Sequence, residues 1–504
     1  MLVTGFVTIS AFLLLGLGAT RTSRGALFMT AGFVLVLVSA SMHVAAYSSF
    51  WPFTGALFLE LGIGSFVLAG LLKRHDGKAR PWFGIGAVSL ALAVLILGWQ
   101  QFEQKSRDAG LIEYESPVQA NHESWLLELG EDDQIQEVAH LLESHGASWE
   151  RAFPSLRMAD DADLAQTWLF RVPASEAETL AEALWADAEN VDHVELNFEV
   201  RLDEPMMGST LSSVDGNLLE NDPLAAQQWA LDAINGHAVH RMVADMKPVR
   251  KARVAILDTG VDAGHEDVTG TFVTSPATVD PHGHGSHCAG IAGAATNNEI
   301  GIASLNWEGR FIEIAGYQAL NEQGFGTIEM IAQAIVDATR DDSDVISMSL
   351  GAKAETPNVI RDAIGFARRN GVIVVASAGN ANEDAIDHMP SNVEGVIVVS
   401  AVDQYLRKAK FSNTNTSLSR PIAAPGVDIL SLKTGGGYVT MSGTSMSTPV
   451  VSGIIGMMRA LNPDMDEETV WTILESTARS IPDSRRIGDL VDAEAALNQV
   501  LERR

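Results

Sequence analysis

Four apolar runs fill the first 100 residues and restrict what this part of the chain can fold into. They extend over about Leu2–Ala19, Ala26–Tyr47, Thr54–Leu72 and Trp82–Trp99. Each approaches the ~20 residues that an α-helix needs to cross a bilayer, where every backbone N–H and C=O must be bonded within the helix. A single run of this kind would also suit a buried core helix or a signal peptide, but four in sequence do not. We therefore expect residues 1–100 to form four transmembrane helices in contact with membrane lipid.

The charges of the short loops predict how these helices are oriented. Arg21 and Arg24 lie between the first two runs, and the loop between the last two holds Lys73, Arg74, Lys78 and Arg80. Because positively charged loops stay in the cytoplasm, the N-terminus and everything beyond Gln100 are expected on the extracytoplasmic side. Glu60, the carboxylate within the third run, could have a functional role or could simply reach the membrane surface.

The rest of the chain has the opposite character and is strongly acidic. Residues 1–100 hold six Lys and Arg against two Asp and Glu, whereas the remainder holds 28 against 62, and the whole chain has a formal net charge of −30. Nucleic acid would repel such an acidic body, which excludes this class of partner. The single cysteine, Cys288, excludes an intramolecular disulfide but does not fix the cellular compartment.

A linker, a small domain, a connector and a large domain follow the apolar runs in this order. Residues 101–121 are polar and predict a linker, and residues 203–220, with Pro, Gly and Ser, predict an exposed connector before a last domain at 221–504. Residues 122–202 have strand and helix patterns in the order β-α-β-β-α-β, which is typical of a ferredoxin-like α+β domain. The expected strands are Ser124–Leu129, Ser148–Phe153, Thr167–Val172 and Val191–Val200, and the expected helices are Asp133–Ser144 and Ala174–Ala188.

Two stretches of the last domain place polar side chains where chemistry is common. The apolar run Arg253–Asp258 predicts a buried strand that ends in a carboxylate, which is where open α/β sheets place their sites, although one such aspartate considered by itself is more typical of a turn. His284 lies in a glycine-rich stretch with His282 and His287. Their spacing lacks the helical histidine pair of zinc proteases, so the glycines favour a helix start that presents His284 as a base.

Two further stretches supply an amide and a hydroxyl. The apolar run Val372–Val375 predicts a strand, and Asn380 follows it as either a left-handed turn residue or an amide donor to an oxyanion. Ser445, within Gly443–Pro449, begins an apolar stretch that predicts a buried helix. The positive end of that helix would stabilise an oxyanion formed beside Ser445, but a serine considered by itself at this position is a helix cap.

Taken together, these four motifs resemble the subtilisin-like serine proteases (subtilases), in which Asp, His and Ser occur in this chain order. The resemblance covers about Asn221–Leu501 and implies a doubly wound, mainly parallel α/β sheet. It implies a nucleophile at Ser445, a general base at His284 and an orienting acid at Asp258. The Asn380 side chain and the backbone N–H of Ser445 would bind the oxyanion.

The same resemblance implies how substrate and inhibitor bind. Ser349-Leu350-Gly351 matches the strand that pairs with extended substrate, with Gly379 in the same cleft, so polypeptides recognised through their backbone are the expected substrates. The small α+β domain resembles the subtilase propeptide, which aids folding and inhibits the protease. A cut between Val200 and Asp222 would release the protease from its anchor unless the propeptide retains it. The alternative function is a non-catalytic peptide receptor or scaffold on the same fold.

Calcium is the cofactor that the resemblance implies, as a structural ion, and no organic cofactor is expected. The implied ligands are the side chains of Asp222, Asp267 and Asn298 and the backbone carbonyls of Ile300 and Ile302. Such carboxylate, amide and carbonyl oxygens are the ligands that hard cations prefer. The alternative is that the two aspartates are turn residues.

Overall fold

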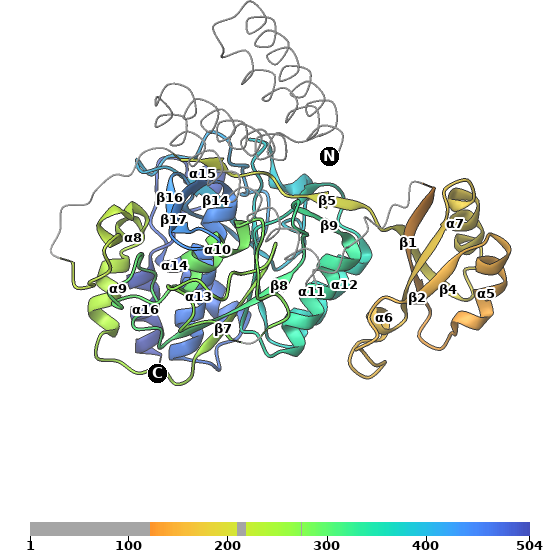
Figure 1. The fold of residues 1–504 in the computed structure, drawn as a ribbon, viewed down its shortest axis with the longest axis horizontal. Coiled ribbons are helices and arrows are strands. Elements are labelled where there is room, and N and C mark those ends of the chain that lie inside the picture. Colours follow the sequence, from red (N-terminus) through yellow and green to blue (C-terminus); the bar gives the residue numbers. More distant parts are fainter. Residues whose placement is uncertain (1–120, 209–217, 274, 504) are drawn as a thin grey trace, which may run out of the picture. The chain divides into compact units, whose positions relative to one another are not determined.

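The computed structural model describes residues 121–208, 218–273 and 275–503. The four predicted transmembrane runs lie outside the described residues, as does nearly all of the predicted linker. Among the residues that are described, no helix is both long and apolar enough to cross a membrane. In Figure 1 the small α+β domain is coloured orange to yellow, and the large domain runs from green to blue.

The α+β domain consists of one antiparallel sheet with two helices packed against it. Its elements are β1 (His122–Leu129), α5 (Ile135–Ser144), β2 (Ser148–Arg151), α6 (Ala162–Ala165), β3 (Thr167–Pro173), α7 (Ala177–Trp185) and β4 (Val191–Leu196). The strand order is β2-β3-β1-β4. The apolar faces of α5 and α7 share one core with alternate residues of the strands, such as Leu127 and Phe170. The elements therefore occur in the predicted order, with the short α6 added.

The prediction of a single strand over Val191–Val200 is wrong. β4 ends at Leu196, and the following β5 (Glu199–Arg201) pairs antiparallel with β9 (Phe325–Thr327) of the large domain. The break falls at the buried Asn197, whose amide donates to a serine of β1 and accepts from a backbone N–H in the first turn of α11 (Ile328–Arg340). The apolar pattern continues through the break because both strands have buried residues. Val194 of β4 is buried in the sheet of the small domain, and Val200 of β5 is buried where that strand pairs with β9.

The large domain is built on a six-stranded sheet in the order β15-β14-β12-β10-β7-β8, in which every pair of neighbours is parallel. The strands are β7 (Ala252–Asp258), β8 (Ile312–Gln318), β10 (Val345–Met348), β12 (Ile373–Ser377), β14 (Ile397–Val402) and β15 (Pro421–Pro425). They are continuous apolar runs because both faces of the sheet are covered. The predicted mainly parallel α/β fold is confirmed.

Helices cover both faces of this sheet (Figure 1). Val254 and Ile256 share a core with α10 (His284–Gly293), α13 (Thr444–Leu461) and α16 (Ala493–Glu502), whereas Ala255 and Leu257 face α11 (Ile328–Arg340) and α12 (Asn358–Arg369). The remaining elements are β6 (Met206–Met207), η1 (Ala225–Gln227), α8 (Trp229–Ala233), α9 (Gly236–Val243), β11 (Ala352–Lys353), η2 (Ala385–Asp387), β13 (His388–Met389), β16 (Ile429–Leu432), β17 (Tyr438–Ser442), α14 (Glu467–Thr477) and α15 (Ser484–Ile487). β6 pairs with β17, so the predicted connector contains a strand.

Candidate active site

Three neighbouring strands of the parallel sheet end at the candidate site. Asp258 is the last residue of β7, Ser349 follows β10 directly, and Asn380 lies three residues after the end of β12. Because β12, β10 and β7 are adjacent and parallel, their carboxyl ends meet at one edge of the sheet. The topology therefore brings together residues that are up to 122 positions apart in the sequence.

The start of α10, the helix that carries His284, is bonded to the carboxylate of Asp280, a residue to which the sequence motifs gave no role. Asp280 accepts hydrogen bonds from the backbone N–H of Gly283 (2.8 Å) and from both the N–H and the hydroxyl of Ser286 (2.7 Å each). It also accepts from the hydroxyl of Thr259, at 2.8 Å. These bonds satisfy donors of the first turn of α10 and fix His284 at its start. An acid just ahead of a helix start is a recognisable signal for such a cap.

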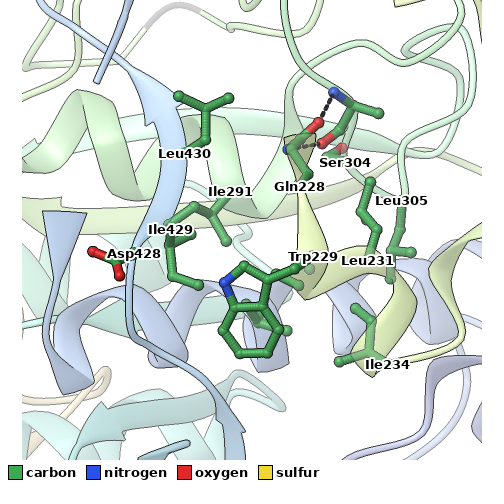
Figure 2. Close-up of a pocket in the computed structure, with 14 residues that line it drawn as sticks. Gln228, Trp229, Leu231, Ile234, Ile291, Ser304, Leu305, Asp428, Ile429 and Leu430 are labelled. Carbon is green, nitrogen blue, oxygen red and sulfur yellow. Dashed lines mark hydrogen bonds between the residues drawn. The ribbon is translucent and has the colours of Figure 1, made fainter. Parts of the chain in front are cut away.

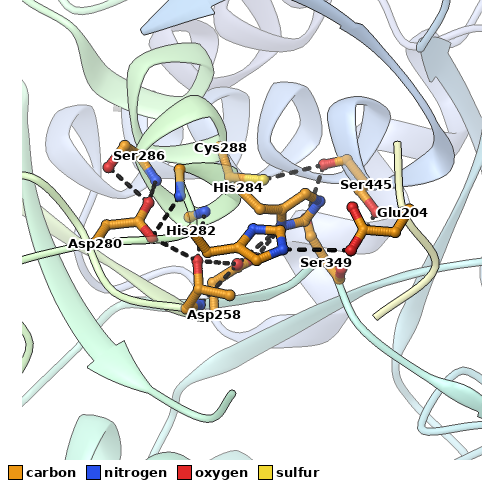
Figure 3. Close-up of polar contacts among 12 residues, drawn as sticks. Glu204, Asp258, Asp280, His282, His284, Ser286, Cys288, Ser349 and Ser445 are labelled. Atoms are coloured by element: carbon orange, nitrogen blue, oxygen red, sulfur yellow. Dashed lines mark hydrogen bonds and ion pairs between the residues drawn. The ribbon is translucent and has the colours of Figure 1, made fainter. Parts of the chain in front are cut away.

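Asp258 and His284 form a buried hydrogen-bonded pair (Figure 3). The Nδ1 atom of His284 lies 2.8 and 2.9 Å from the two carboxylate oxygens, and both side chains are fully buried. Burial lowers the pKa of His284, but the carboxylate of Asp258 outweighs this effect, so the pKa lies above its ordinary value. With the proton on Nδ1, the Nε2 atom is free to accept a proton from a substrate or a nucleophile.

Ser445 is held in place through its backbone carbonyl. It is the second residue of α13, and Pro449, four residues later, has no N–H to bond to that carbonyl. The Ser349 hydroxyl (2.8 Å) and the Cys288 thiol (3.5 Å) donate to it instead. Since Cys288 lies one helical turn after His284, this contact fixes α10 and α13 against each other.

The hydroxyl of Ser445 is not bonded to the histidine in this arrangement. It donates to the carbonyl of Ser349 at 3.2 Å, and the buried Nε2 of His284 has no hydrogen-bond partner among the described residues. Hydrogen bonds between a nucleophile and its base are often long or absent until substrate binds. The structure therefore places the serine and the histidine at one site without the bond that would link them.

Asn380 is oriented by the residue that precedes the serine. Its Oδ1 atom accepts from the N–H (2.9 Å) and the hydroxyl (3.0 Å) of Thr444, which leaves the Nδ2 hydrogens as donors. Gly379, with a φ of +96°, takes the left-handed conformation at this turn, so the alternative of a left-handed Asn380 is wrong. A Cβ atom on Gly379 would lie only 2.6 Å from the amide nitrogen of Asn413, so glycine is required there.

A cleft with a volume of about 160 Å³ lies beside Asn380 and Ser445, whereas Asp258 and His284 are not among its lining residues. Its lining includes all four predicted substrate-binding residues, together with Asn380 and Ser445: Ser349, Leu350, Gly351 and Gly379. Asp203 from the predicted connector also lines the cleft, and the N–H of the preceding Leu202 donates to the carbonyl of Gly324 at 2.8 Å. The first residue of the predicted connector therefore lies at the cleft.

Known proteins share this fold and these motifs. A model of the Subtilase family (Peptidase_S8) matches residues 250–499. Subtilisin BL of Lederbergia lenta is 33% identical over 274 residues, which cover 53% of this chain and 97% of that protein. This chain belongs to the subtilase family. It is a subtilisin-like serine protease.

Two further relatives agree with this assignment. The thermophilic serine proteinase of Bacillus sp. (strain AK1) is 41% identical over 235 residues, which cover 45% of this chain and 56% of that relative, so the match spans about half of its length. Among solved structures, a protease chain from Pseudoalteromonas arctica PAMC 21717 superimposes with a TM-score of 0.51 and 26% identity. That match covers 56% of this chain and 99% of the solved one.

The predicted oxyanion donor, Asn380, gives a first testable expectation. Asn380→Leu should lower kcat about 100- to 1000-fold with little change in KM, because the amide would act only on charge that develops in the transition state; the magnitude is that of the oxyanion asparagine in a subtilisin. Steady-state kinetics on a chromogenic peptide measure both constants. Asn382→Gly is the matched control, since this exposed residue has a left-handed backbone that glycine accepts. An increase in KM with unchanged kcat would contradict the assigned role.

The predicted calcium ligands also lie close together in this subtilase. The amide of Asn298 donates to Asp267 (2.9 Å), and its backbone N–H bonds to Asp222 (3.3 Å). The N–H groups of Ile300 and Ile302 bond to the side chains of Asn298 and Asp267, so both isoleucines belong to the same loop. Burial, together with the nearby charge of Asp267, raises the pKa of Asp222 to about 6. A cation would relieve the repulsion between these two carboxylates, so the donor set fits calcium.

A second pocket, away from the cleft, offers little room for a ligand (Figure 2). Its lining is mostly apolar, including Leu231, Ile429 and Leu430, and its volume is about 30 Å³, near the share of one water molecule. The polar groups at its edge have partners, since the side chain of Gln228 exchanges two hydrogen bonds with the backbone of Ala303. We assign it no role.

Proposed function

We propose that this chain is a membrane-anchored, extracytoplasmic serine endopeptidase in which Asp258, His284 and Ser445 form the catalytic triad and Asn380 donates to the oxyanion. The observation that carries this proposal is the fully buried hydrogen bond between Asp258 and His284, at a site that also contains the start of α13. A buried carboxylate–imidazole pair with a perturbed pKa is typical of functional sites, and Cys288, one turn after His284 on α10, bonds to the backbone carbonyl of Ser445.

The chemistry then follows from the positions of the donors and acceptors. Ser445 attacks the scissile carbonyl while Nε2 of His284 takes its proton, and Asp258 stabilises the imidazolium that results. The Nδ2 hydrogens of Asn380 and the backbone N–H of Ser445, the second residue of its helix, bind the developing oxyanion. His284 next protonates the leaving amine, and water hydrolyses the acyl-enzyme by the same steps.

A fluorophosphonate probe tests this function directly, because it reacts only with an activated serine. We expect labelling of purified, processed protein at Ser445, together with cleavage of casein. If folded and processed protein shows neither labelling nor casein cleavage, the alternative of a non-catalytic peptide receptor or scaffold is favoured. Labelling that persists in Ser445→Ala would show that another residue is the nucleophile.

We further propose that the α+β domain is the propeptide and inhibits the protease. Two of its residues bond to the starts of helices in the large domain. The carboxylate of Glu195 accepts from the N–H groups of Asn358 and Val359 in α12 (2.8 and 3.0 Å), and Asn197 accepts from the N–H of Glu329 in α11 (3.0 Å). These backbone donors have no partner within their own helices, and a negative charge stabilises a helix N-terminus. The contacts support both inhibition and assistance in folding.

The connector would be the first substrate of this enzyme. Val200 and Leu202 are buried, and Asp203 lies in the cleft with Ser445. We therefore expect cleavage after Asp203, so that the mature protease begins at Glu204. N-terminal sequencing of the active species measures this, and the Ser445→Ala protein should remain uncut. A mature N-terminus outside the interval from Val200 to Asp222 would contradict self-cleavage in the connector.

Cleavage at this point would separate the protease from the four apolar runs. Blotting membrane and soluble fractions with an antibody to the large domain should then show full-length antigen in membranes and a shorter form that is free or held by the propeptide. Cells with activity but only full-length, membrane-bound antigen would exclude release. Antigen protected from protease added outside intact cells would contradict the extracytoplasmic location.

We also propose a structural calcium ion held by Asp222, Asp267, Asn298 and the carbonyls of Ile300 and Ile302. The folded pKa of Asp222, about 6, lies above its ordinary value of 3.8. The native state then binds more protons than the unfolded state between these values, so the calcium-free protein should lose stability as the pH rises from about 4 to about 6.

Calcium should remove this loss. At about 1000 times its dissociation constant an ion adds ~4 kcal/mol of stability, or on the order of 10 °C in Tm for a domain of this size. Thermal melts in EDTA and in calcium, at pH 5 and pH 7, measure both effects. Asp222→Asn should abolish the response, whereas Asp245→Asn, which removes an exposed carboxylate, should keep it. An equal calcium response in both variants would place the ion elsewhere.

A further inference from the structure

A second cluster of ionisable side chains lies where the large domain begins, and the proposed catalytic function does not use it. Glu220, His237 and His240 are 6%, 7% and 0% exposed. The two histidines lie three positions apart on α9, so they share one face of that helix. One ligand atom from each of the three residues lies within 4.8 Å of the other two, which is a spacing that a single metal ion could span.

Both imidazoles turn the same nitrogen toward the glutamate. The Nδ1 atom of His240 lies 3.2 Å from Oε2 of Glu220, and Nδ1 of His237 contacts the other oxygen, Oε1. The carboxylate therefore lies between two ring nitrogens, and its side chain is fully buried. These contacts converge on one small volume of the domain.

The outward nitrogens of both rings face oxygen atoms, at different distances. Nε2 of His240 donates to the backbone carbonyl of Ser304 at 2.6 Å, whereas Nε2 of His237 lies 3.5 Å from the carboxylate of Asp232 with no hydrogen bond between them. Metal-binding histidines are typically oriented as His240 is, with the non-ligating N–H donated to a carbonyl or a carboxylate.

The centre of this arrangement holds either protons or a cation. A neutral His237 can donate from Nδ1 to Glu220, but neutral His240, with its hydrogen on Nε2, turns the lone pair of Nδ1 toward the carboxylate. Either a proton lies between His240 and Glu220, or one cation lies among the three groups. A divalent ion needs only neutral rings, and it would bond to both Nδ1 atoms and to the ionised carboxylate at once.

We propose that Glu220, His237 and His240 bind a divalent transition-metal ion such as Zn²⁺, for which imidazole and carboxylate are suitable ligands. The ion joins the residue immediately before Asn221 to α9. Once the connector is cut upstream, it holds the new N-terminal segment against the domain, next to the proposed calcium loop. This inference does not rest on the catalytic proposal, since it involves no residue of the cleft.

Cobalt is a suitable probe because Co²⁺ absorbs visible light when it has imidazole and carboxylate ligands. Full-length Ser445→Ala protein, which cannot digest itself, is freed of metal with a chelator, returned to calcium and titrated with Co²⁺. We expect saturation at one equivalent and displacement by Zn²⁺. If the folded protein binds neither ion, the cluster is held by protons and the proposal is overturned.

Variants then locate the ion. Glu220→Gln and His240→Gln should each weaken Co²⁺ binding more than 10-fold. Asp232→Asn, at a side chain that is 45% exposed, should weaken it 10- to 100-fold without disturbing the fold, because it removes the carboxylate that lies 3.5 Å from Nε2 of His237 and would orient this ring when it binds the ion. Unchanged affinity in the Asp232 variant would overturn the proposal even if the buried variants do not fold. A sulfur-to-cobalt charge-transfer band would place the ion instead at Asp258, His284 and Cys288, which also lie close enough to share a metal.

Discussion

Ser445→Ala is expected to lower kcat/KM for a peptide substrate by on the order of 10⁶-fold, a magnitude taken from the nucleophile of a subtilisin. The loss should lie almost wholly in kcat, because the hydroxyl forms a bond to the substrate carbonyl and the rest of the cleft is retained. The only hydrogen bond that the structure gives this hydroxyl is to the carbonyl of Ser349, so the variant should lose no more than about 1 kcal/mol of stability. Assays with a chromogenic peptide and thermal melts measure the two effects.

Ser452→Ala is the matched control for this prediction. Ser452 lies on the same helix, is equally buried, and donates only to the carbonyl of Thr448 within that helix. Its loss should leave both activity and self-cleavage of the connector unchanged. If Ser445→Ala retained activity within about 10-fold of the wild type, or if the two variants behaved alike, Ser445 would not be the nucleophile.

Asp258→Asn is expected to cost about 10⁴-fold in kcat, which is the loss known for the same change in a chymotrypsin-like triad. The amide keeps the shape of the carboxylate and can still accept from the N–H of Thr259 through Oδ1. It would, however, offer a donor to Nδ1 of His284, which favours the tautomer with hydrogen on Nε2. That tautomer cannot take a proton from Ser445.

The pH dependence of the residual activity distinguishes this role from simple misfolding. Activity requires neutral His284, so kcat/KM rises with pH through the pKa of that residue. In the wild type Asp258 holds this pKa above its ordinary value against the opposing effect of burial. In Asp258→Asn burial is opposed only by the lesser effects of Asp280 and Glu204 on this pKa, so the rising limb should move to lower pH. Asp245→Asn removes the same negative charge at an exposed position and should leave the rising limb in place. A shift of the limb to higher pH in Asp258→Asn would contradict the role of Asp258 in raising the pKa of His284.

Much of the fold followed from local patterns. The strands of the parallel sheet are apolar runs, and three of them end in or just before a residue singled out for chemistry: Asp258, Ser349 and Asn380. The start of α13 at Thr444 agrees with the small-residue turn ahead of an apolar stretch. These features depend on neighbours in sequence, because strand ends and helix starts are set by burial period and by turn residues.

Other features depended on contacts between distant parts of the chain. The prediction of one strand from Val191 to Val200 is wrong because β5 pairs with β9, which lies more than 120 residues later in the chain. Thr444 and the carbonyl of Ser445 were not assigned roles, since their partners are chosen by how helices pack against the sheet. The convergence of Glu220 with two histidines of α9 likewise has no local pattern.

By itself, the sequence determined the candidate nucleophile, base, acid and oxyanion donor, because each lies in a short motif whose residue types suit one step of peptide hydrolysis. Only the tertiary structure decided that Asp258 and His284 are hydrogen-bonded, that Asn380 is oriented by Thr444, and that the hydroxyl of Ser445 bonds to Ser349 rather than to the histidine. The physical reason is that a motif specifies which groups are available, whereas hydrogen bonds form over about 3 Å, a distance that depends on how all the elements pack.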